Sequence, residues 1–406
     1  MLDEEQPRAA PRAEAWRVVA ALFVVTACVS TAVSSFGVFL PVLTETFGWS
    51  RGAVSSALAI NLFTGGLAAF PVGSIADRRG PRGVLAATVL IGATGFALTA
   101  GLTSLWHLYA TYGLLVGIGM SSIYVLSTTT VSRWFTERRG LALSIVLSGF
   151  NLGWLLGGPF TALLVRHLGW RGAYLGLALL IASVAGPATL GVRYPVRPRA
   201  ARAPGEPGAA PVGTVLRRAL ADPRFWCLGG AWFVFGLVFM TISVHSVPYA
   251  LDAGLSLERA ALALSAFGVG AGMGRLVAGA AADRFGARAT MRVCVAVQAV
   301  SLAILVLGPP LWALLPVLVA FGVGASGGDN SFVKVVPDVF GLGALASVMS
   351  VLGMGWRTGA ALGPAVAGFL HDATRAYTIP FSAALILLAA GAALFAAGTR
   401  RVPGAR

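Results

Sequence analysis

The stretch GSIADRRGPR at residues 73–82 returns as GAAADRFGAR at residues 279–288, an offset of 206 positions. In both copies an Asp-Arg pair stands between glycines and directly follows a long apolar run. Glycine-rich membrane composition would not by itself preserve this pair of charges. The repeat therefore indicates that the chain contains two related halves.

Two shorter repeats support this division. Gly117-Ile-Gly119 matches Gly322-Val-Gly324, and Gly158-Pro159 matches Gly363-Pro364, both at an offset of 205 positions. The three repeated pairs keep the same order along the chain. Such a pattern is typical of two homologous bundles of membrane helices.

The composition indicates the environment of the chain. Of its 406 residues, 57% are hydrophobic and 11% are charged, and the mean hydropathy is +0.82. Soluble proteins carry about 25% charged residues, so the chain is expected to lie in a lipid bilayer. A window of about 19 residues predicts twelve transmembrane helices, at residues 17–44, 53–75, 83–102, 106–132, 141–165, 171–192, 225–250, 258–280, 289–308, 311–337, 342–370 and 376–398.

A segment rich in Pro, Arg, Ala and Gly separates the sixth predicted helix from the seventh. It has no apolar periodicity, as expected of a cytoplasmic linker. We therefore predict an all-α membrane protein with twelve transmembrane helices in two pseudo-symmetric six-helix bundles. The bundles are expected at residues 1–192 and 225–406, joined by the linker at residues 193–224.

The basic residues predict the orientation of these helices, because Lys and Arg in short loops resist translocation. If both termini are cytoplasmic, five of the 30 basic residues fall on the outer side: Arg51, Arg166, Arg171, Arg259 and Arg375. We therefore expect a multi-pass protein of the cytoplasmic (inner) membrane with both termini inside. The basic loops account for the net charge of +15, so nucleic-acid binding is not expected.

Three ionisable residues lie deep within predicted helices, where a charge is costly unless it faces a cavity or a partner. Arg275 precedes the cytoplasmic Asp283 by eight residues, or about 12 Å of helix. Arg357 lies near the middle of the eleventh helix. Because guanidinium groups bind carboxylates through two parallel hydrogen bonds, both arginines are candidate substrate-binding residues.

The third such residue, Asp329, predicts proton coupling. The 205-residue offset places it opposite Tyr124, so both are expected to face a central cavity. When Asp329 is ionised, its charge and those of Arg275 and Arg357 sum to +1, which suits a monocarboxylate. When it is protonated they sum to +2, which suits a dicarboxylate. Proton symport follows if protonation frees an arginine for the substrate, whereas the alternative is a static Asp–Arg pair that joins helices.

Three polar residues are weaker candidates for substrate contact. His245 is expected in the outer third of the seventh helix, where it either contacts substrate or relays protons, or simply hydrogen-bonds a backbone carbonyl. Tyr124 and Asn151 could donate hydrogen bonds to a substrate carboxylate. Either could equally serve as a polar contact between helices.

The repeated Gly-x-x-x-Asp-Arg-x-Gly-x-Arg stretch resembles the loop signature of the major facilitator superfamily, and the resemblance covers essentially the whole chain. It implies two six-helix bundles that rock about a central site. It also implies cytoplasmic charge contacts that stabilise one conformation, made in part by the gating residues Asp77, Arg78, Arg82, Asp283, Arg284 and Arg288.

A narrower resemblance rests on the run RWFTERRGLA at residues 133–142, on HSVPYA at residues 245–250 and on Gly274-Arg275. These segments are similar to monocarboxylate transporters and to the bacterial oxalate/formate exchangers. The chain departs from both groups. It has Ala271 one turn before Arg275, where animal monocarboxylate transporters usually have an acid, and it lacks most of the aromatic cage of the oxalate exchangers.

The sequence contains no nucleotide-binding glycine loop and no paired Cys/His motif, so we expect neither an enzyme, nor a cofactor, nor a metal site. We predict a monomeric secondary transporter that moves a small organic anion, a monocarboxylate above all, by proton symport with alternating access. The alternatives are an anion exchanger of the oxalate/formate type, a drug exporter and a non-transporting membrane sensor.

Overall fold

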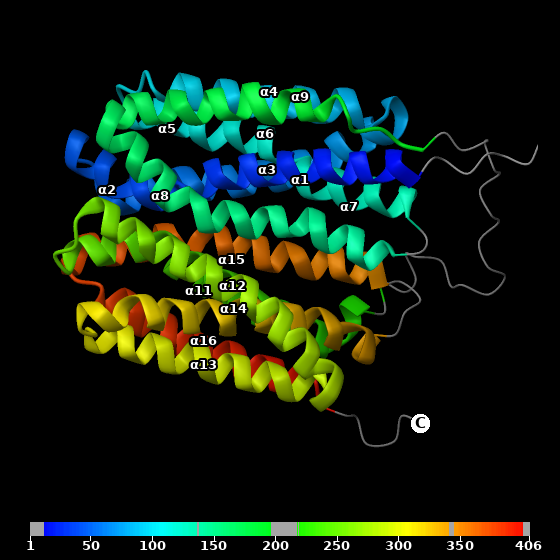
Figure 1. Ribbon diagram of the computed structural model, residues 1–406. Coiled ribbons are helices and arrows are strands. Elements are labelled where there is room, and N and C mark those ends of the chain that lie inside the picture. The colour runs from blue at the N-terminus through cyan, green and yellow to red at the C-terminus, as the bar shows by residue number, and fades with distance from the viewer. Residues whose placement is uncertain (1–11, 136–137, 196–216, 218, 341–344, 401–406) are drawn as a thin grey trace, which may run out of the picture.

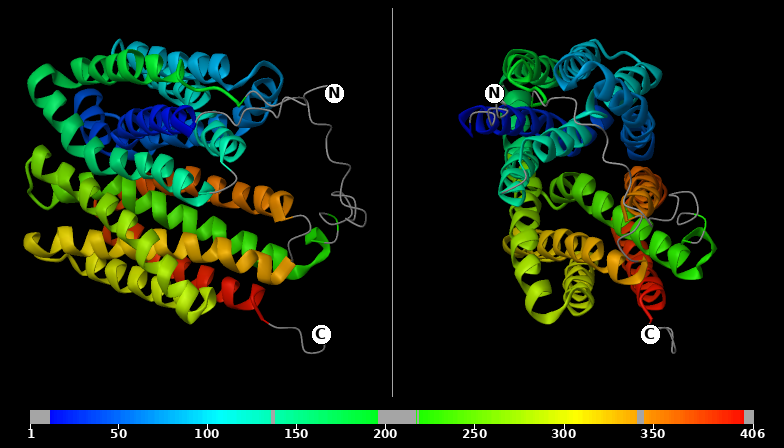
Figure 2. Two further views of the ribbon diagram at one scale, coloured as in Figure 1. Left: turned by 45° about the vertical axis from the view of Figure 1, so that its right-hand side comes forward. Right: turned by 90° about the vertical axis from the view of Figure 1, so that its right-hand side faces the viewer.

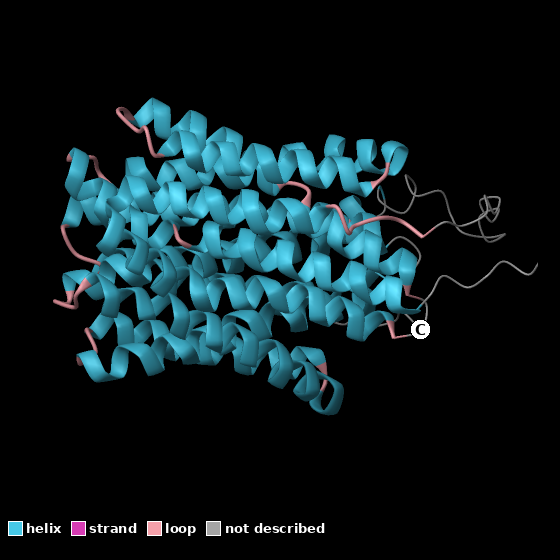
Figure 3. Ribbon diagram, turned by 45° about the horizontal axis from the view of Figure 1, so that its top comes forward, coloured by secondary structure: helices cyan, strands magenta, loops and turns pink. Residues whose placement is uncertain are grey.

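The computed structural model describes residues 12–135, 138–195, 217, 219–340 and 345–400. In these ranges all regular structure is helical (Figure 3). The elements are α1 (Arg12–Ser34), α2 (Phe36–Phe47), α3 (Arg51–Arg79), α4 (Pro81–Thr99), α5 (Leu105–Leu108), η1 (Tyr109–Val116), α6 (Gly117–Met120), α7 (Ile123–Trp134), α8 (Arg139–Leu180), η2 (Ile181–Ala185), α9 (Gly186–Thr189), α11 (Pro223–Asp252), α12 (Leu257–Phe285), α13 (Ala287–Leu307), α14 (Leu311–Phe340), α15 (Leu345–Thr374) and α16 (Thr378–Gly398).

Ten stretches of the described chain are long and apolar enough to cross a membrane. One of them, Arg139–Thr189, has 51 residues and reverses direction at Gly169, whose φ of 68° and ψ of 173° break the helix. It therefore holds two of the helices that the sequence predicts, as the turn of α8 in Figure 1 shows. A further predicted helix corresponds to α15, which has 30 residues. The all-α membrane fold is confirmed.

The helices run side by side in two groups, α1–α9 and α11–α16, shown in the upper and lower parts of Figure 1. Each group has its own core of buried apolar side chains. In the first, the rings of Phe39 and Tyr174 stack with centroids 3.8 Å apart. In the second, Trp232 stacks on Phe332 at 4.7 Å. The start of α1 and the end of α16 lie on one side of the bundle, here named the termini side, and the other side is named the opposite side (Figure 2).

The helix α11 begins where local sequence dictates. Pro223 takes the first helical position, and Asp222 caps the helix by accepting a hydrogen bond from the backbone N–H of Arg224 at 2.9 Å. Pro and Asp are favoured at these two positions. Most of the segment expected to link the bundles, residues 196–216 and 218, lies outside the described residues.

Glycines bring α12 and α14 into close contact. A Cβ atom on Gly270 or Gly274 would collide with the backbone of α14 at Val319 and Val323. Small residues at such positions let membrane helices approach closely. Because Arg275 follows Gly274, its side chain starts directly beside α14.

Candidate functional site

The two arginines within the spans have no carboxylate partner among the described residues. The side chain of Arg275 is exposed, and its Nε donates a hydrogen bond to Ser326 Oγ at 3.0 Å. Arg357 is also exposed and extends from α15 toward α3 of the other half, since a Cβ atom on Gly66 would lie 3.8 Å from its Nη1. Neither takes part in an ion pair within the described ranges. Both guanidinium groups therefore remain available to an anion.

Asp329 lies on α14, three residues after the Ser326 that binds Arg275. Its Oδ1 accepts a hydrogen bond from Trp232 Nε1 of α11 at 2.8 Å. The positive charge of Arg275 acts on the same carboxylate. The helix pair α12/α14 thus brings together two of the three residues singled out in the sequence, and α11 adds a third group, the indole of Trp232.

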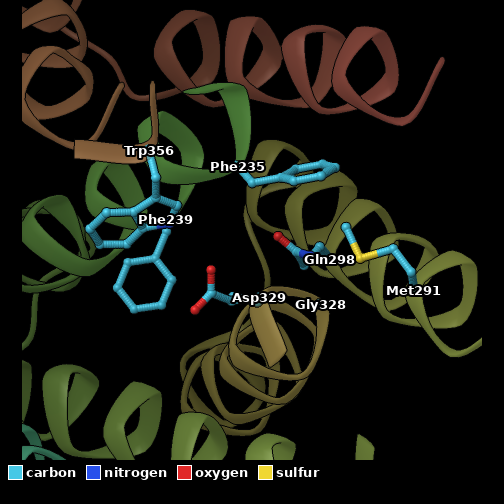
Figure 4. Close-up of a pocket in the computed structure, with 8 residues that line it drawn as sticks. Phe235, Phe239, Met291, Gln298, Gly328, Asp329 and Trp356 are labelled. Carbon is cyan, nitrogen blue, oxygen red and sulfur yellow. The ribbon is translucent and has the colours of Figure 1, made fainter. Parts of the chain in front are cut away.

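The carboxylate of Asp329 points into a small pocket beneath the rings of Phe239 and Trp356 (Figure 4). Gln298 and Met291 of α13 form the other wall. The cavity measures about 10 Å³, which is room for roughly one water molecule. This pocket adjoins Asp329 and can hold one water molecule beside its carboxylate.

Four aromatic residues that the sequence reasoning missed join the two halves near this pocket. Trp154 of α8 lies 6.2 Å from Phe239 and 5.7 Å from Phe267, measured between ring centroids. Phe239 in turn lies 5.9 Å from Trp356. Aromatic residues make up 10% of the chain. Nothing in the local sequence distinguishes these four from aromatic residues that only fill the hydrophobic core.

The halves touch toward the opposite side and separate toward the termini side. Between the centre and the opposite side, α12 contacts α8. Ser265 Oγ donates a hydrogen bond to the carbonyl oxygen of Leu155 at 2.6 Å, and a Cβ atom on Gly268 would lie 3.0 Å from the Leu155 nitrogen. One turn further toward the termini side, no described atom lies within 4 Å of a Cβ atom on Gly272. The space beside Arg275 is therefore open on the termini side.

A polar cluster, here named the Arg51 cluster, joins the halves on the opposite side. Arg51 of α3 binds Asp252 of α11 through two parallel hydrogen bonds of 2.7 and 2.8 Å, and Nη1 also donates to Tyr377 Oη at 2.9 Å. The backbone N–H of Arg51 donates to Asp372 Oδ1 at 3.0 Å. His371 Nε2 completes the cluster, 3.2 Å from Arg51 Nη1. One arginine thus links the first half to two helices of the second.

The structure places His245 in contact with the Arg51 cluster. Its side chain is fully buried, with Nδ1 at 2.9 Å from Tyr377 Oη and Nε2 at 2.9 Å from the carbonyl oxygen of Pro364. Because a carbonyl only accepts, Nε2 carries the proton and Nδ1 accepts from Tyr377. Both ring nitrogens are used, and among the described residues no hydrogen bond connects this imidazole with Arg275 or Arg357.

The two candidates of the first half are less closely tied to the arginines. Tyr124 on α7 is 53% exposed, and its ring centroid lies 6.2 Å from that of Phe150. Asn151 on α8 is half-buried. Within the described ranges, no hydrogen bond joins either side chain to Arg275, Arg357 or Asp329.

The two aspartates of the repeated stretch form matching ion pairs, each within its own half. Asp77 binds Arg133 of α7 at 2.6 Å, and Asp283 binds Lys334 of α14 at 2.6 Å. The partners were not predicted, although both stand near the termini-side ends of helices that follow their aspartates. The four arginines predicted as gating residues form no ion pair in the described part of the chain: Arg78, Arg82, Arg284 and Arg288.

Comparison with known proteins gives consistent results. The family model of the Major Facilitator Superfamily matches residues 22–263 and 247–406. The human protein "Monocarboxylate transporter 11" is 32% identical, over 96% of this chain and 83% of that protein. "Monocarboxylate transporter 13" of Rattus norvegicus is 29% identical, over 93% of this chain and 87% of that protein.

Two solved structures share the fold. A bacterial homologue of the human lysosomal transporter Spinster, in an inward-facing and unoccupied conformation, superimposes with a TM-score of 0.80 at 17% identity, covering 97% of this chain and 100% of that one. The nucleoside transporter NupG gives 0.79 at 13% identity, covering 95% and 100%.

Proposed function

The chain belongs to the major facilitator superfamily and is a membrane transporter; on this premise we propose that it carries a small organic anion, a monocarboxylate, by proton symport. The proposal rests on one observation. Two arginines within the spans, Arg275 and Arg357, have exposed side chains and no carboxylate partner among the described residues. A substrate carboxylate supplies the partner that both lack.

The names of the relatives agree with this substrate class, since each is called a monocarboxylate transporter. Tyr124 and Asn151 are retained as proposed hydrogen-bond donors to the substrate from the first half. His245 is a weaker candidate for direct contact, because both of its nitrogens already have partners. We assign it instead to the stability of the Arg51 cluster.

Asp329 is the proposed proton carrier. It is the acid beside Arg275, and its protonation would remove a negative charge that competes with the substrate carboxylate for the guanidinium group. In the empty carrier, the two arginines and the ionised Asp329 have a summed charge of +1. In the loaded carrier, the two arginines, the neutral Asp329 and the bound monocarboxylate also sum to +1. Loading a proton and an anion together therefore leaves the charge of the site unchanged, which favours their joint movement across the bilayer.

The contacts between the halves support a proposal of alternating access. We propose that the termini side is cytoplasmic, in an inner membrane, so that the described state is inward-facing with the Arg51 cluster closing the outer side. The halves at residues 1–192 and 225–406 would rock about the aromatic contact of Trp154 with Phe239, with the segment 193–224 as their linker. A single chain holds the whole site, so a monomer suffices.

The ion pairs of Asp77 and Asp283 are proposed to shape the cytoplasmic ends of the helices that meet when this side closes. We expect Asp77 to make a charge contact across the halves when this side closes, beyond its pair with Arg133 in the described state. Asp77→Asn should then destabilise the closed state by up to about 1 kcal/mol, since the side chain is well exposed, and should raise the inward-open population up to about fivefold. The measure is the rate of maleimide labelling of Gly272→Cys in a background without the three native cysteines. An unchanged rate would count against the gating role, and Arg292→Lys, an exposed residue of α13, serves as the control.

Asp329→Asn tests proton symport directly. The asparagine fixes the neutral state, so exchange of internal for external lactate in proteoliposomes should persist within about threefold, whereas uptake driven by a pH gradient should fall at least about tenfold, because the carrier can no longer load and release a proton. Both rates are measured in the same vesicles. Equal loss of both, or loss of neither, would refute the assignment of Asp329.

Anion exchange is the second candidate, because two arginines can clamp a dicarboxylate. Counterflow measured with lactate, pyruvate, formate, oxalate and tartrate distinguishes proton symport from anion exchange. Preference for oxalate or tartrate with no response to a pH gradient would favour exchange, whereas pH-driven accumulation of lactate or pyruvate supports symport.

A further inference from the structure

The indole of Trp232 is held in one orientation beside Asp329. Its side chain is only 7% exposed. One face stacks on Phe332 with centroids 4.7 Å apart and planes 23° apart. The ring edge at Cζ3 is directed toward Gly353 of α15, where an added Cβ atom would lie 4.0 Å from it. Contacts from α14 and α15 therefore fix the direction in which Nε1–H points.

The chemistry of the indole limits how Asp329 can use its two oxygens. An indole N–H donates and never accepts, so the Trp232 bond at 2.8 Å always requires Oδ1 to act as an acceptor. The carbonyl oxygen of a neutral carboxyl group is a better acceptor than its hydroxyl oxygen, so the Trp232 bond to Oδ1 favours a proton on Oδ2. Within the described residues, no hydrogen bond reaches Oδ2, which leaves it open to a proton, to a water or to Arg275.

Among the described residues, one other charge acts on Asp329. Arg275 of α12 acts on the carboxylate, while α13 presents the neutral Gln298 and Met291, and α15 presents the neutral Trp356. On α14 itself, Lys334 is occupied by Asp283 at 2.6 Å. The carboxylate thus lies between a fixed neutral donor and a cation on a long side chain that can turn away.

We propose that Trp232 is a positioning residue that directs the transported proton to Oδ2 of Asp329 and sets the pH range in which the carrier works. The proposal rests on the proposed role of Asp329 as the proton carrier. Because its hydrogen bond stabilises the ionised carboxylate, Trp232 makes the acid release its proton more readily at neutral pH. Arg275 cannot take over this task, since its guanidinium group is also needed by the substrate.

Trp232→Phe is the test, because phenylalanine keeps the stacking on Phe332 and removes only the donor. Lactate uptake in proteoliposomes is measured as a function of pH. The pH of half-maximal uptake should move upward by about one to two units, the size expected for one hydrogen bond to a charged group. Trp356→Phe is the matched control, because Trp356 lines the same pocket and makes no hydrogen bond to Asp329 among the described residues. It should leave the midpoint within about 0.3 units.

An infrared titration of the purified protein gives a second readout that does not depend on transport. The C=O stretch of the protonated carboxyl, assigned by its loss in Asp329→Asn, should persist to higher pH in Trp232→Phe than in the unmodified protein. No shift in Trp232→Phe, or an equal shift in Trp356→Phe, would overturn the proposal. If Trp232→Phe fails to fold, Phe332→Leu loosens the indole while keeping its N–H, and should move both midpoints in the same direction by a smaller amount.

The two proposals fail differently. If Asp329→Asn keeps the full pH dependence of uptake, Asp329 is not the proton carrier, and its role in the proposed function is refuted. The infrared titration then still shows whether Trp232 controls the protonation of this carboxyl. If Asp329→Asn abolishes pH-driven uptake but Trp232→Phe leaves both midpoints unchanged, only the positioning role is wrong.

Discussion

Arg275→Lys should raise the lactate concentration for half-maximal uptake by roughly ten- to a hundredfold, and Arg275→Ala should reduce uptake to background. The lysine keeps the charge but replaces a planar, two-pronged donor by a point charge, so one charge-assisted hydrogen bond of about 1.5 to 3 kcal/mol is lost. It also loses Nε, which holds the side chain on Ser326 at 3.0 Å. Initial rates of counterflow over a range of lactate concentrations measure the effect.

Arg292→Lys is the matched control, because this arginine of α13 is exposed and has no ion pair in the described part of the chain. It should leave the half-saturating concentration unchanged. If both arginines hold one ligand, Arg357→Lys should lower the apparent affinity for a dicarboxylate more than that for a monocarboxylate. An unaltered lactate affinity in Arg275→Lys would remove Arg275 from the site.

The second large effect is expected on the Arg51 cluster. Arg51→Ala removes both bonds to Asp252 and the bond to Tyr377, and so removes the main polar connection between the halves on the opposite side. The Arg51 side chain is 14% exposed and that of Asp252 is 39% exposed. We therefore expect about 2 kcal/mol rather than the 3 to 5 kcal/mol of a buried pair, or a roughly thirtyfold shift toward the outward-open state.

Labelling of Ser243→Cys by a membrane-impermeant maleimide measures this shift, because Ser243 lines a closed cavity of about 20 Å³ between the halves. The three native cysteines are removed first. Arg166→Ala is the matched control: its pair with Glu258 also bridges the halves, at 3.2 Å, but the side chains are 63% and 47% exposed, so its loss should change labelling less than about threefold. Equal labelling of Arg51→Ala and the unmodified protein would show that the cluster does not hold this side closed.

Much of the candidate site could be proposed from the sequence for a simple physical reason. Charges are so costly in hydrocarbon that Arg275, Asp329 and Arg357 stand out in any apolar run, whatever lies around them. The 205-residue offset added a geometric argument, because related halves put corresponding residues on corresponding helix faces. No similar argument identifies a functional role for apolar or aromatic residues. In the sequence, Trp232 cannot be distinguished from the other aromatic residues.

The sequence by itself determined that this chain is a two-fold repeated bundle of membrane helices, because the apolar runs, the basic loops and the GSIADRRGPR repeat are properties of single segments or of spacing. The sequence did not determine which side chains contact each other across helices. Asp77 with Arg133, Asp329 with Trp232 and Arg51 with Asp252 are separated by 56, 97 and 201 residues. Helical periodicity tells which face a residue occupies but not which helix faces it. Only the packing of α11, α12 and α14 decided that Asp329 meets an indole as well as an arginine, and only the contact of the two halves decided which side of the site is closed.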